Sequence, residues 1–150
     1  MPADLPAFLA RFRDDLNAAA PPPKFRSYFT AREPPVCLEH GPTGHADLPF
    51  LGEAFTGGDE IVRYYELIGS ILEGKGSNFR QEDVVFKEVR GGRVKAIWTG
   101  DAVWSVAKTG REWHEAVVWL FEVAVEEEEW KIARWEVWAD TLSAYLASQS

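Results

Sequence analysis

The chain has 150 residues and a formal net charge of −8, with 24 acidic against 16 Lys and Arg side chains. This charge argues against binding to nucleic acid or to an anionic membrane surface, because both would repel the protein. The length fits a single domain over residues 1–150. The one cysteine, Cys37, excludes an internal disulfide and fits a reducing compartment. The N-terminal segment carries early acids and no unbroken apolar run, so we expect a cytoplasmic protein.

The first third of the chain predicts a helix and a short strand. Apolar residues recur at helical spacing over residues 4–20, with Asp4 as the N-cap. Three prolines at 21–23 end this helix, because proline cannot donate a backbone N–H. Residues 25–29 predict a short helical turn, and the alternating segment 36–40 predicts a strand followed by a loop.

The middle of the chain predicts a second helix and two strands. Residues 59–72 have a wide apolar face and two acids in their first turn, and the glycine-containing segment 73–77 ends this helix. Strands are predicted over 83–90 and 93–107, joined by a Gly-Gly turn that needs positive φ. A glycine within residues 99–101 predicts a β-bulge in the second of these strands.

The C-terminal part predicts a long β-hairpin over residues 111–140, turning at the acidic segment 126–129, and then a helix over 141–147. Strict alternation places Ile132 on the same face as Arg134. Helices followed by long antiparallel strands predict an α+β fold, in which a curved sheet wraps over the N-terminal helices around a cone-shaped hollow. Both hairpin faces are mostly apolar and the helices can cover only one, so we expect a homodimer through the outer face.

Three segments carry a family resemblance: residues 50–65 read FLGEAFTGGDEIVRYY, residues 109–113 read TGREW and residues 130–140 read WKIARWEVWAD. Their pattern of glycines, aromatics and apolar spacing resembles a SnoaL-like domain of the NTF2-like superfamily, most of all its fungal members. The resemblance covers roughly residues 28–147 and implies the α+β cone, with a pocket between the helices and the concave sheet face. The family includes polyketide cyclases, ketosteroid isomerases, scytalone dehydratase and limonene-epoxide hydrolase, and also non-catalytic binders and dimerisation modules.

Three residues are candidates for catalysis. In ketosteroid isomerases a catalytic acid ends the first short strand, and the resemblance places His40 there; the alternative is a histidine satisfied by backbone hydrogen bonds at the pocket mouth. Tyr65 can hydrogen-bond a substrate carbonyl, as in an oxyanion hole, or serve only as core. Glu115 is either a carboxylate whose pKa is raised by burial in the pocket or a strand-end charge in solvent. The rarity of buried acids favours solvent.

The SnoaL-like cyclase mechanism lacks its residues in this chain. The His and Asp that such cyclases carry on the last two strands fall near Trp119 and near Val137 or its neighbour Glu136. The His is missing, and the acid is kept only if the register slips by one residue, which would move it to the opposite face. An aromatic wall is predicted to hold the substrate, made of Phe50, Tyr64, Trp98, Trp119, Phe121 and Trp135. No cofactor is expected, and the histidines and the cysteine lack the spacing of a metal site.

Three hypotheses about function follow. The first is a small cofactor-free enzyme, an isomerase, cyclase, dehydratase or hydrolase, that moves a proton on a hydrophobic small molecule. The second is a non-catalytic small-molecule-binding or dimerisation module of the same fold. The third is a cone that is packed solid with tryptophan and has no pocket.

Overall fold

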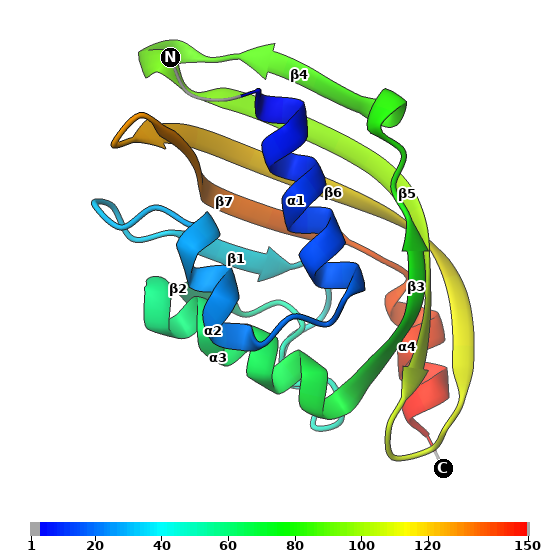
Figure 1. The fold of residues 1–150 in the computed structure, drawn as a ribbon. Helices are drawn as coiled ribbons and strands as arrows, with labels where there is room; N and C mark the ends of the chain where they lie inside the picture. Colours follow the sequence, from blue (N-terminus) through cyan, green and yellow to red (C-terminus); the bar gives the residue numbers. More distant parts are fainter. Residues whose placement is uncertain (1–3, 150) are drawn as a thin grey trace.

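Helices cover the concave face of one strongly curved sheet in the computed structural model, which describes residues 4–149 (Figure 1). The helices are α1 Leu5–Asn17, α2 Pro22–Phe25, α3 Gly58–Ile71 and α4 Thr141–Ser148, with short 3₁₀ turns at Arg26–Tyr28, Gln81–Asp83 and Arg90–Gly92. The strands are β1 Val36–Glu39, β2 Ala54–Thr56, β3 Leu72–Asn78, β4 Val84–Glu88, β5 Val94–Val106, β6 Glu112–Glu126 and β7 Glu129–Trp138. The α+β architecture predicted from the sequence is confirmed.

The sheet has the strand order β2-β1-β7-β6-β5-β3, and β4 also pairs with β5. Only the β1–β7 pair of these strands is parallel; the others are antiparallel. The two longest strands, β5 and β6, pair along almost their whole length and carry the curvature (Figure 1). The termini of the described chain lie at opposite ends of the molecule (Figure 1).

Helix α1 is anchored on the inner face of the sheet by Phe12, whose side chain is fully buried. The Phe12 ring meets the rings of Trp119, Phe121 and Trp135 edge to face, at centroid distances of 6.2, 5.6 and 5.2 Å. Such aromatic pairs contribute about 0.5–1.5 kcal/mol each beyond the burial of their area. At the start of the helix, Asp4 occupies the N-cap position, but its side chain makes no capping hydrogen bond. The predicted N-cap position is therefore confirmed without a side-chain cap, and the packing of Phe12 holds the helix in place.

The hairpin of β6 and β7 turns where the acidic segment predicts, but β7 departs from strict alternation. Glu122 pairs with Arg134 and Val123 pairs with Ile132, so Ala133 is an extra residue on β7. This β-bulge turns Ile132 inward, where it is fully buried. The predicted placing of Ile132 on the face of Arg134 is therefore wrong.

The structure adds two strands that periodicity does not predict. The short strand β2 pairs with β1, and β3 occupies residues that were expected only to end α3. The β3 sequence, LEGKGSN, contains two glycines and no apolar alternation, and nearly all of its residues are exposed. Its pairing with β5 makes it a strand, because context overrides the weak β propensity of glycine.

Gly100 forms no β-bulge, contrary to the sequence prediction, because β5 and β6 stay in register through its pair with Val117. Instead, β5 changes its other neighbour at this point, from β4 to β3. A Cβ atom on Gly100 would lie 2.6 Å from the carbonyl oxygen of Asn78 and 2.6 Å from the ring of Phe79. The glycine therefore allows the segment that leaves β3 to cross closely over β5.

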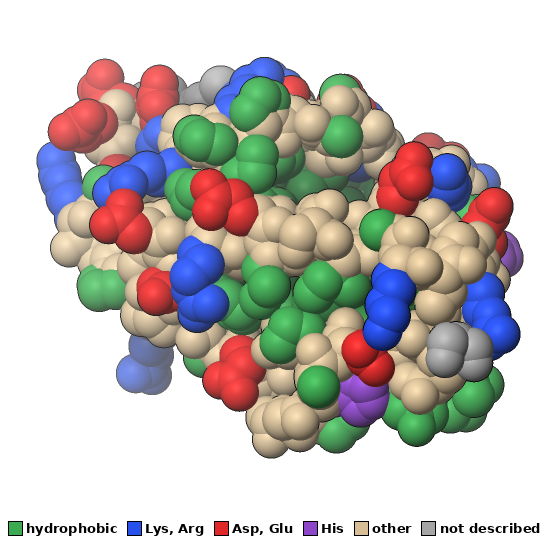
Figure 2. All heavy atoms as spheres, turned by 90° about the horizontal axis from the view of Figure 1, so that it is seen from below, with side chains coloured by type: hydrophobic (Ala, Val, Ile, Leu, Met, Phe, Trp, Pro, Cys, Tyr) green, Lys and Arg blue, Asp and Glu red, His purple; other side chains and the backbone are tan. Residues whose placement is uncertain are grey.

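The surface mixes charges with isolated apolar side chains. Figure 2 shows acidic, basic and apolar side chains interspersed on one face. Large apolar side chains that are exposed include Val85, Ile97, Trp138 and Leu142. Within residues 4–149, no helix is long and apolar enough to cross a membrane.

The close crossing at Gly100 gives a test of the fold. Gly100→Ala should lower the free energy of unfolding by about 1–3 kcal/mol, because the new methyl group overlaps the Asn78 backbone and the Phe79 ring. The matched control is Gly69→Ala on α3, where a Cβ meets open space and should be neutral or stabilising by up to about 1 kcal/mol. Urea denaturation measures both, and equal stability of the two variants would contradict the crossing.

Candidate functional site

A pocket of about 620 Å³ lies between the concave sheet face and helices α1, α2 and α3. Its walls are mostly apolar and aromatic, with a few carboxyl, hydroxyl and amide groups. This volume lies in the range of about 300–1,000 Å³ that is usual for small-molecule sites. The hypothesis of a solid cone is therefore wrong.

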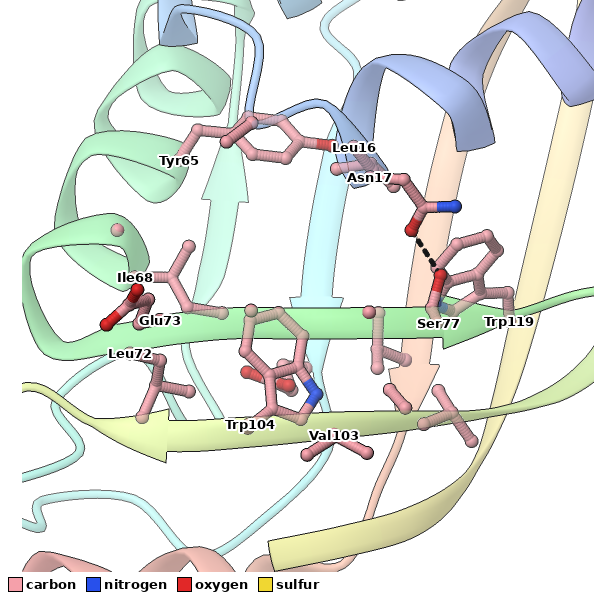
Figure 3. A pocket seen from close by; sticks show the side chains of 18 of the residues that line it. Leu16, Asn17, Tyr65, Ile68, Leu72, Glu73, Ser77, Val103, Trp104 and Trp119 are labelled. Atoms are coloured by element: carbon pink, nitrogen blue, oxygen red, sulfur yellow. Dashed lines mark hydrogen bonds between the residues drawn. The ribbon is translucent and has the colours of Figure 1, made fainter. Parts of the chain in front are cut away.

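The pocket opens between the C-terminal end of α1 and strand β3. Asn17 and Gly74 belong to its lining and are exposed, which places them at the mouth. A hydrogen bond from the Ser77 hydroxyl to the Asn17 side chain joins the two sides (Figure 3). Figure 3 also shows Tyr65 reaching from α3 toward Leu16 at the end of α1. One polar contact thus ties the helix to the strand at the entrance.

Glu39 is a buried carboxyl group at the floor of the pocket. Strand β1 runs parallel to β7, with Cys37 opposite Trp135 and Glu39 opposite Val137. Residues that pair across a sheet share a face, so Glu39 lies on the inner face with these two residues. Glu39 is only 8 % exposed to solvent, and its Oε2 atom has no hydrogen-bond partner within residues 4–149.

Glu115 on β6 is the second carboxyl group of the floor and is also buried. Its Oε2 accepts hydrogen bonds from Trp113 Nε1 at 2.9 Å and from the backbone N–H of Asp140 at 3.0 Å. Burial raises the pKa of Glu115, and these hydrogen bonds offset only part of the rise. The expectation of a strand-end charge in solvent is wrong, and Glu115 is a pocket residue.

Glu39 and Glu115 share an environment that disfavours two negative charges. Burial, and then the charge of Glu115, raise the pKa of Glu39 to about 8. No lysine, arginine or histidine among the described residues lines the pocket to neutralise them. Nor do three His, Cys, Asp or Glu side chains in residues 4–149 group so as to hold a metal ion. Glu39 therefore carries a proton at neutral pH and is available as an acid.

Two hydrogen-bond donors in the pocket lining also lack partners in the part of the chain that the structure describes. They are the hydroxyl of Tyr65 and the Nε1 of Trp135, both buried. The Tyr65 ring stacks on Phe25 at 4.2 Å and on Trp135 at 5.8 Å, which fixes its position. Burial holds the pKa of Tyr65 well above its ordinary value, so the hydroxyl keeps its proton. A ligand oxygen could satisfy such donors, as these groups otherwise remain unpaired at a cost.

His40 does not belong to the pocket lining. It follows Glu39 in the chain and faces the opposite side of the sheet, where its Nε2 lies 2.7 Å from Glu136 Oε1. Its ring stacks on Trp138 at 4.1 Å, and Glu136 also accepts a hydrogen bond from Arg134 Nε at 2.8 Å. The expected position of His40 at the pocket is therefore wrong, and the side chain of the preceding residue, Glu39, lines the pocket instead.

Three of the six residues predicted for the aromatic wall do line the pocket: Tyr64, Trp119 and Trp135. Trp119 lies flat against the ring of Phe79, with centroids 3.7 Å apart. Phe79, which the sequence reasoning did not single out, completes this side of the pocket.

The other three predicted wall residues are not part of this pocket. Trp98 is buried in the core, and its indole N–H donates to the carbonyl oxygen of Arg80 at 2.7 Å. Phe121 packs beneath Phe12 and is fully buried. Phe50 lines a much smaller recess beside α4. The alternation of apolar residues places these side chains on the inner face of the sheet. It does not distinguish the part of that face that is packed as core from the part that lines the pocket.

Glu39, Trp104 and the mouth residue Asn17 were missed by the sequence reasoning. Glu39 precedes the predicted position by one residue, and the two faces of the segment 36–40 are similarly apolar. One usable signal was Cys37, a residue type that is usually buried and that shares a face with Glu39. The mouth was missed because β3 was not predicted.

Comparisons with known proteins agree on the fold. No protein-family model matches the sequence, and no curated protein matches it. Among solved structures, a ketosteroid isomerase-like protein from Erwinia carotovora atroseptica superposes with a TM-score of 0.67 at 15% identity, over 89% of this chain and 91% of that chain. An NTF2-like protein from Burkholderia xenovorans gives 0.60 at 17% identity, over 95% and 94%. ActVI-ORFA from Streptomyces coelicolor gives 0.65 at 10% identity, over 90% and 93%. The fold is therefore NTF2-like, as the sequence resemblance implies.

The raised pKa of Glu39 predicts a dependence of stability on pH. The Glu39 carboxyl group has its ordinary pKa of 4.5 in the unfolded chain and a pKa of about 8 in the folded chain. Between these two pH values the folded protein therefore holds one proton that the unfolded chain has lost. Stability is therefore lost as pH rises from about 5 to about 8, by on the order of 2–5 kcal/mol. In Glu39→Gln this loss should disappear.

Thermal unfolding at several pH values measures this effect. The melting temperature of the wild type should fall relative to that of Glu39→Gln by about 5 °C or more across this range. Glu66→Gln, which changes an exposed carboxylate on α3, serves as the control and should follow the wild type. Parallel curves for Glu39→Gln and the wild type would show that Glu39 is not perturbed.

Proposed function

We propose that this protein is a small enzyme that moves a proton on a hydrophobic small molecule bound in the pocket, with Glu39 as the acid/base. The supporting observation is a carboxyl group that is buried, unpartnered at Oε2 and set in an apolar pocket of suitable size. A general acid/base works best when its pKa lies near the working pH, and a pKa of about 8 meets that condition.

The proposed chemistry uses three groups of the pocket lining, Glu39 and Glu115 on the sheet and Tyr65 on α3. In its ionised form, Glu39 removes a proton from a carbon next to a substrate carbonyl, and the same carboxyl returns that proton to another carbon or to the leaving oxygen. Tyr65 donates its O–H to the oxygen on which negative charge develops, and keeps its proton because burial raises its pKa. Glu115, held by Trp113 and the Asp140 backbone, keeps the pKa of Glu39 high. Isomerisation, cyclisation and dehydration all use such a proton transfer.

Exchange of carbon-bound hydrogen tests this proposal without knowledge of the natural substrate. The probe is 2-tetralone, an apolar bicyclic ketone, in D₂O, with deuterium incorporation followed by proton NMR. The wild type should accelerate exchange, and Glu39→Gln should slow it by about 100-fold or more. Tyr65→Phe should slow it by about tenfold or more, because an oxyanion donor is lost.

Glu66→Gln is the matched control and should exchange at the wild-type rate. The rate with the wild type should rise with pH up to about 8, as Glu39 becomes ionised. Equal rates for the wild type and Glu39→Gln would overturn the assignment of Glu39. Binding of 2-tetralone without exchange would favour the alternative, a non-catalytic binding module.

We further propose that the protein is a homodimer through the outer face of the sheet. Val85, Ile97 and Leu120 pair side by side on that face across β4, β5 and β6. Val85 and Ile97 are 65% and 43% exposed, and Trp138 is 40% exposed. A second copy related by a two-fold axis would cover this apolar row with the same row.

Ile97→Glu should convert the dimer to a monomer, because dimer formation would then bury a charge in the apolar row. The variant should not destabilise the monomer, where the Ile97 side chain is already exposed. Light scattering at micromolar concentration measures the mass. Leu142→Glu, at an equally apolar exposed position on α4, should remain dimeric. A monomeric wild type at that concentration would refute the dimer.

We also propose a cytoplasmic location, with which Cys37, a buried free thiol, is consistent. A reducing compartment preserves such a thiol. Fractionation of the native host, with detection of the protein in the cytosolic fraction, tests this location.

A further inference from the structure

The charged groups of the pocket are all of one sign. Its lining contains three carboxylates, Glu39, Glu73 and Glu115, and within the described chain no lysine, arginine or histidine. Glu73 is exposed at the mouth and lies 3.2 Å from Lys75, so its charge is already balanced. The two floor carboxyls have no such cation. The basic residues adjacent to them in the chain, His40 and His114, lie on the other face of the sheet, where they contact Glu136 and Asp101.

The walls beside these carboxyls are aromatic rings. Trp104, Trp119, Trp135 and Tyr65 all line the pocket. Figure 3 shows Trp104 on β5 across the pocket from Tyr65. The face of an aromatic ring attracts a cation, and tryptophan does so most strongly. Tyr65, Trp119 and Trp135 stack on other rings, so Trp104 is the tryptophan of the lining that has no stacked ring among the described residues. Aromatic walls next to unbalanced carboxyls are the combination that recognises an organic cation.

We infer that the ligand of this pocket is a hydrophobic amine, bound as its protonated cation with the nitrogen between Glu39 and Glu115. The inference rests on the proposed function, because it names the ligand class of the same pocket. A carboxylate or phosphate ligand is disfavoured, since the pocket would then bury like charges without a counter-ion. The unpartnered Oε2 of Glu39 accepts the ammonium N–H, and the rings enclose the carbon skeleton.

Binding of the cation releases a proton. In the empty pocket Glu39 is protonated at neutral pH, because burial and the charge of Glu115 disfavour its ionisation. The groups that face it, Glu115, Cys37 and Tyr64, supply no positive charge. An ammonium group supplies that charge, so the Glu39 carboxylic acid becomes a carboxylate and its proton passes to the buffer.

Three ligands with one carbon skeleton and different charges test the inference: 2-aminotetralin, 2-tetralol and tetralin-2-carboxylate. Isothermal titration calorimetry of the wild type at pH 7 gives their dissociation constants. The amine should bind at least about tenfold more tightly than the alcohol, and the carboxylate at least about tenfold more weakly. Titration of the amine in buffers of different ionisation enthalpy should show release of about one proton, and titration of the alcohol should show none.

Glu39→Gln separates the charge effect from the shape of the pocket. In this variant the amine should lose most of its advantage over the alcohol and release no proton, while the alcohol binds as it does to the wild type. An alcohol that binds the wild type as tightly as the amine, without proton release, would overturn the inference and leave the proposed pocket function standing. Failure of all three ligands and of 2-tetralone to bind would overturn both.

Discussion

The burial of Glu39 beside Glu115, in a pocket whose described lining holds no basic side chain, is the constraint on which the proposed chemistry depends. Two carboxylates in an apolar surrounding cannot both be ionised at little cost, so one of them holds a proton. Glu115 accepts hydrogen bonds from Trp113 and Asp140, whereas Oε2 of Glu39 has no partner among residues 4–149. This difference makes Glu39 the protonated member, and both the proposed acid and the proposed preference for positive ligands rest on it.

The fold creates this environment through the register of β1 on β7 and the anchoring of α1. The parallel pairing of Glu39 with Val137 turns the carboxyl inward, and the aromatic contacts of Phe12 fill one part of the concave face. Helix α1 ends at Asn17, beside the mouth, so the remaining part of the concavity stays open. The same sheet therefore has a packed half, with Trp98 and Phe121, and a hollow half, with Trp119 and Trp135.

The sequence predicted the architecture well because long amphipathic helices and a long aromatic hairpin have strong periodic signals. It predicted Tyr65, Trp119 and Trp135 at the pocket for the same reason. The resemblance placed the catalytic candidate at His40, one residue after the proposed acid/base Glu39, and the short strand could not correct this because it shows two alternating faces but not which of them points inward. The bulge at Ala133, the strand β3 and the crossing over Gly100 depend on contacts between distant segments, which local pattern does not encode.

The protonation state of Glu39 tests this account most directly. Carbon-13 NMR of the glutamate side-chain carboxyl groups, titrated between about pH 4 and pH 10 and assigned with Glu39→Gln, follows each ionisation separately. The account predicts that the Glu39 signal titrates with a pKa of about 8. A Glu39 signal that titrates near the ordinary value of 4.5 would contradict the account, because the pocket would then hold two stable carboxylates and no acid.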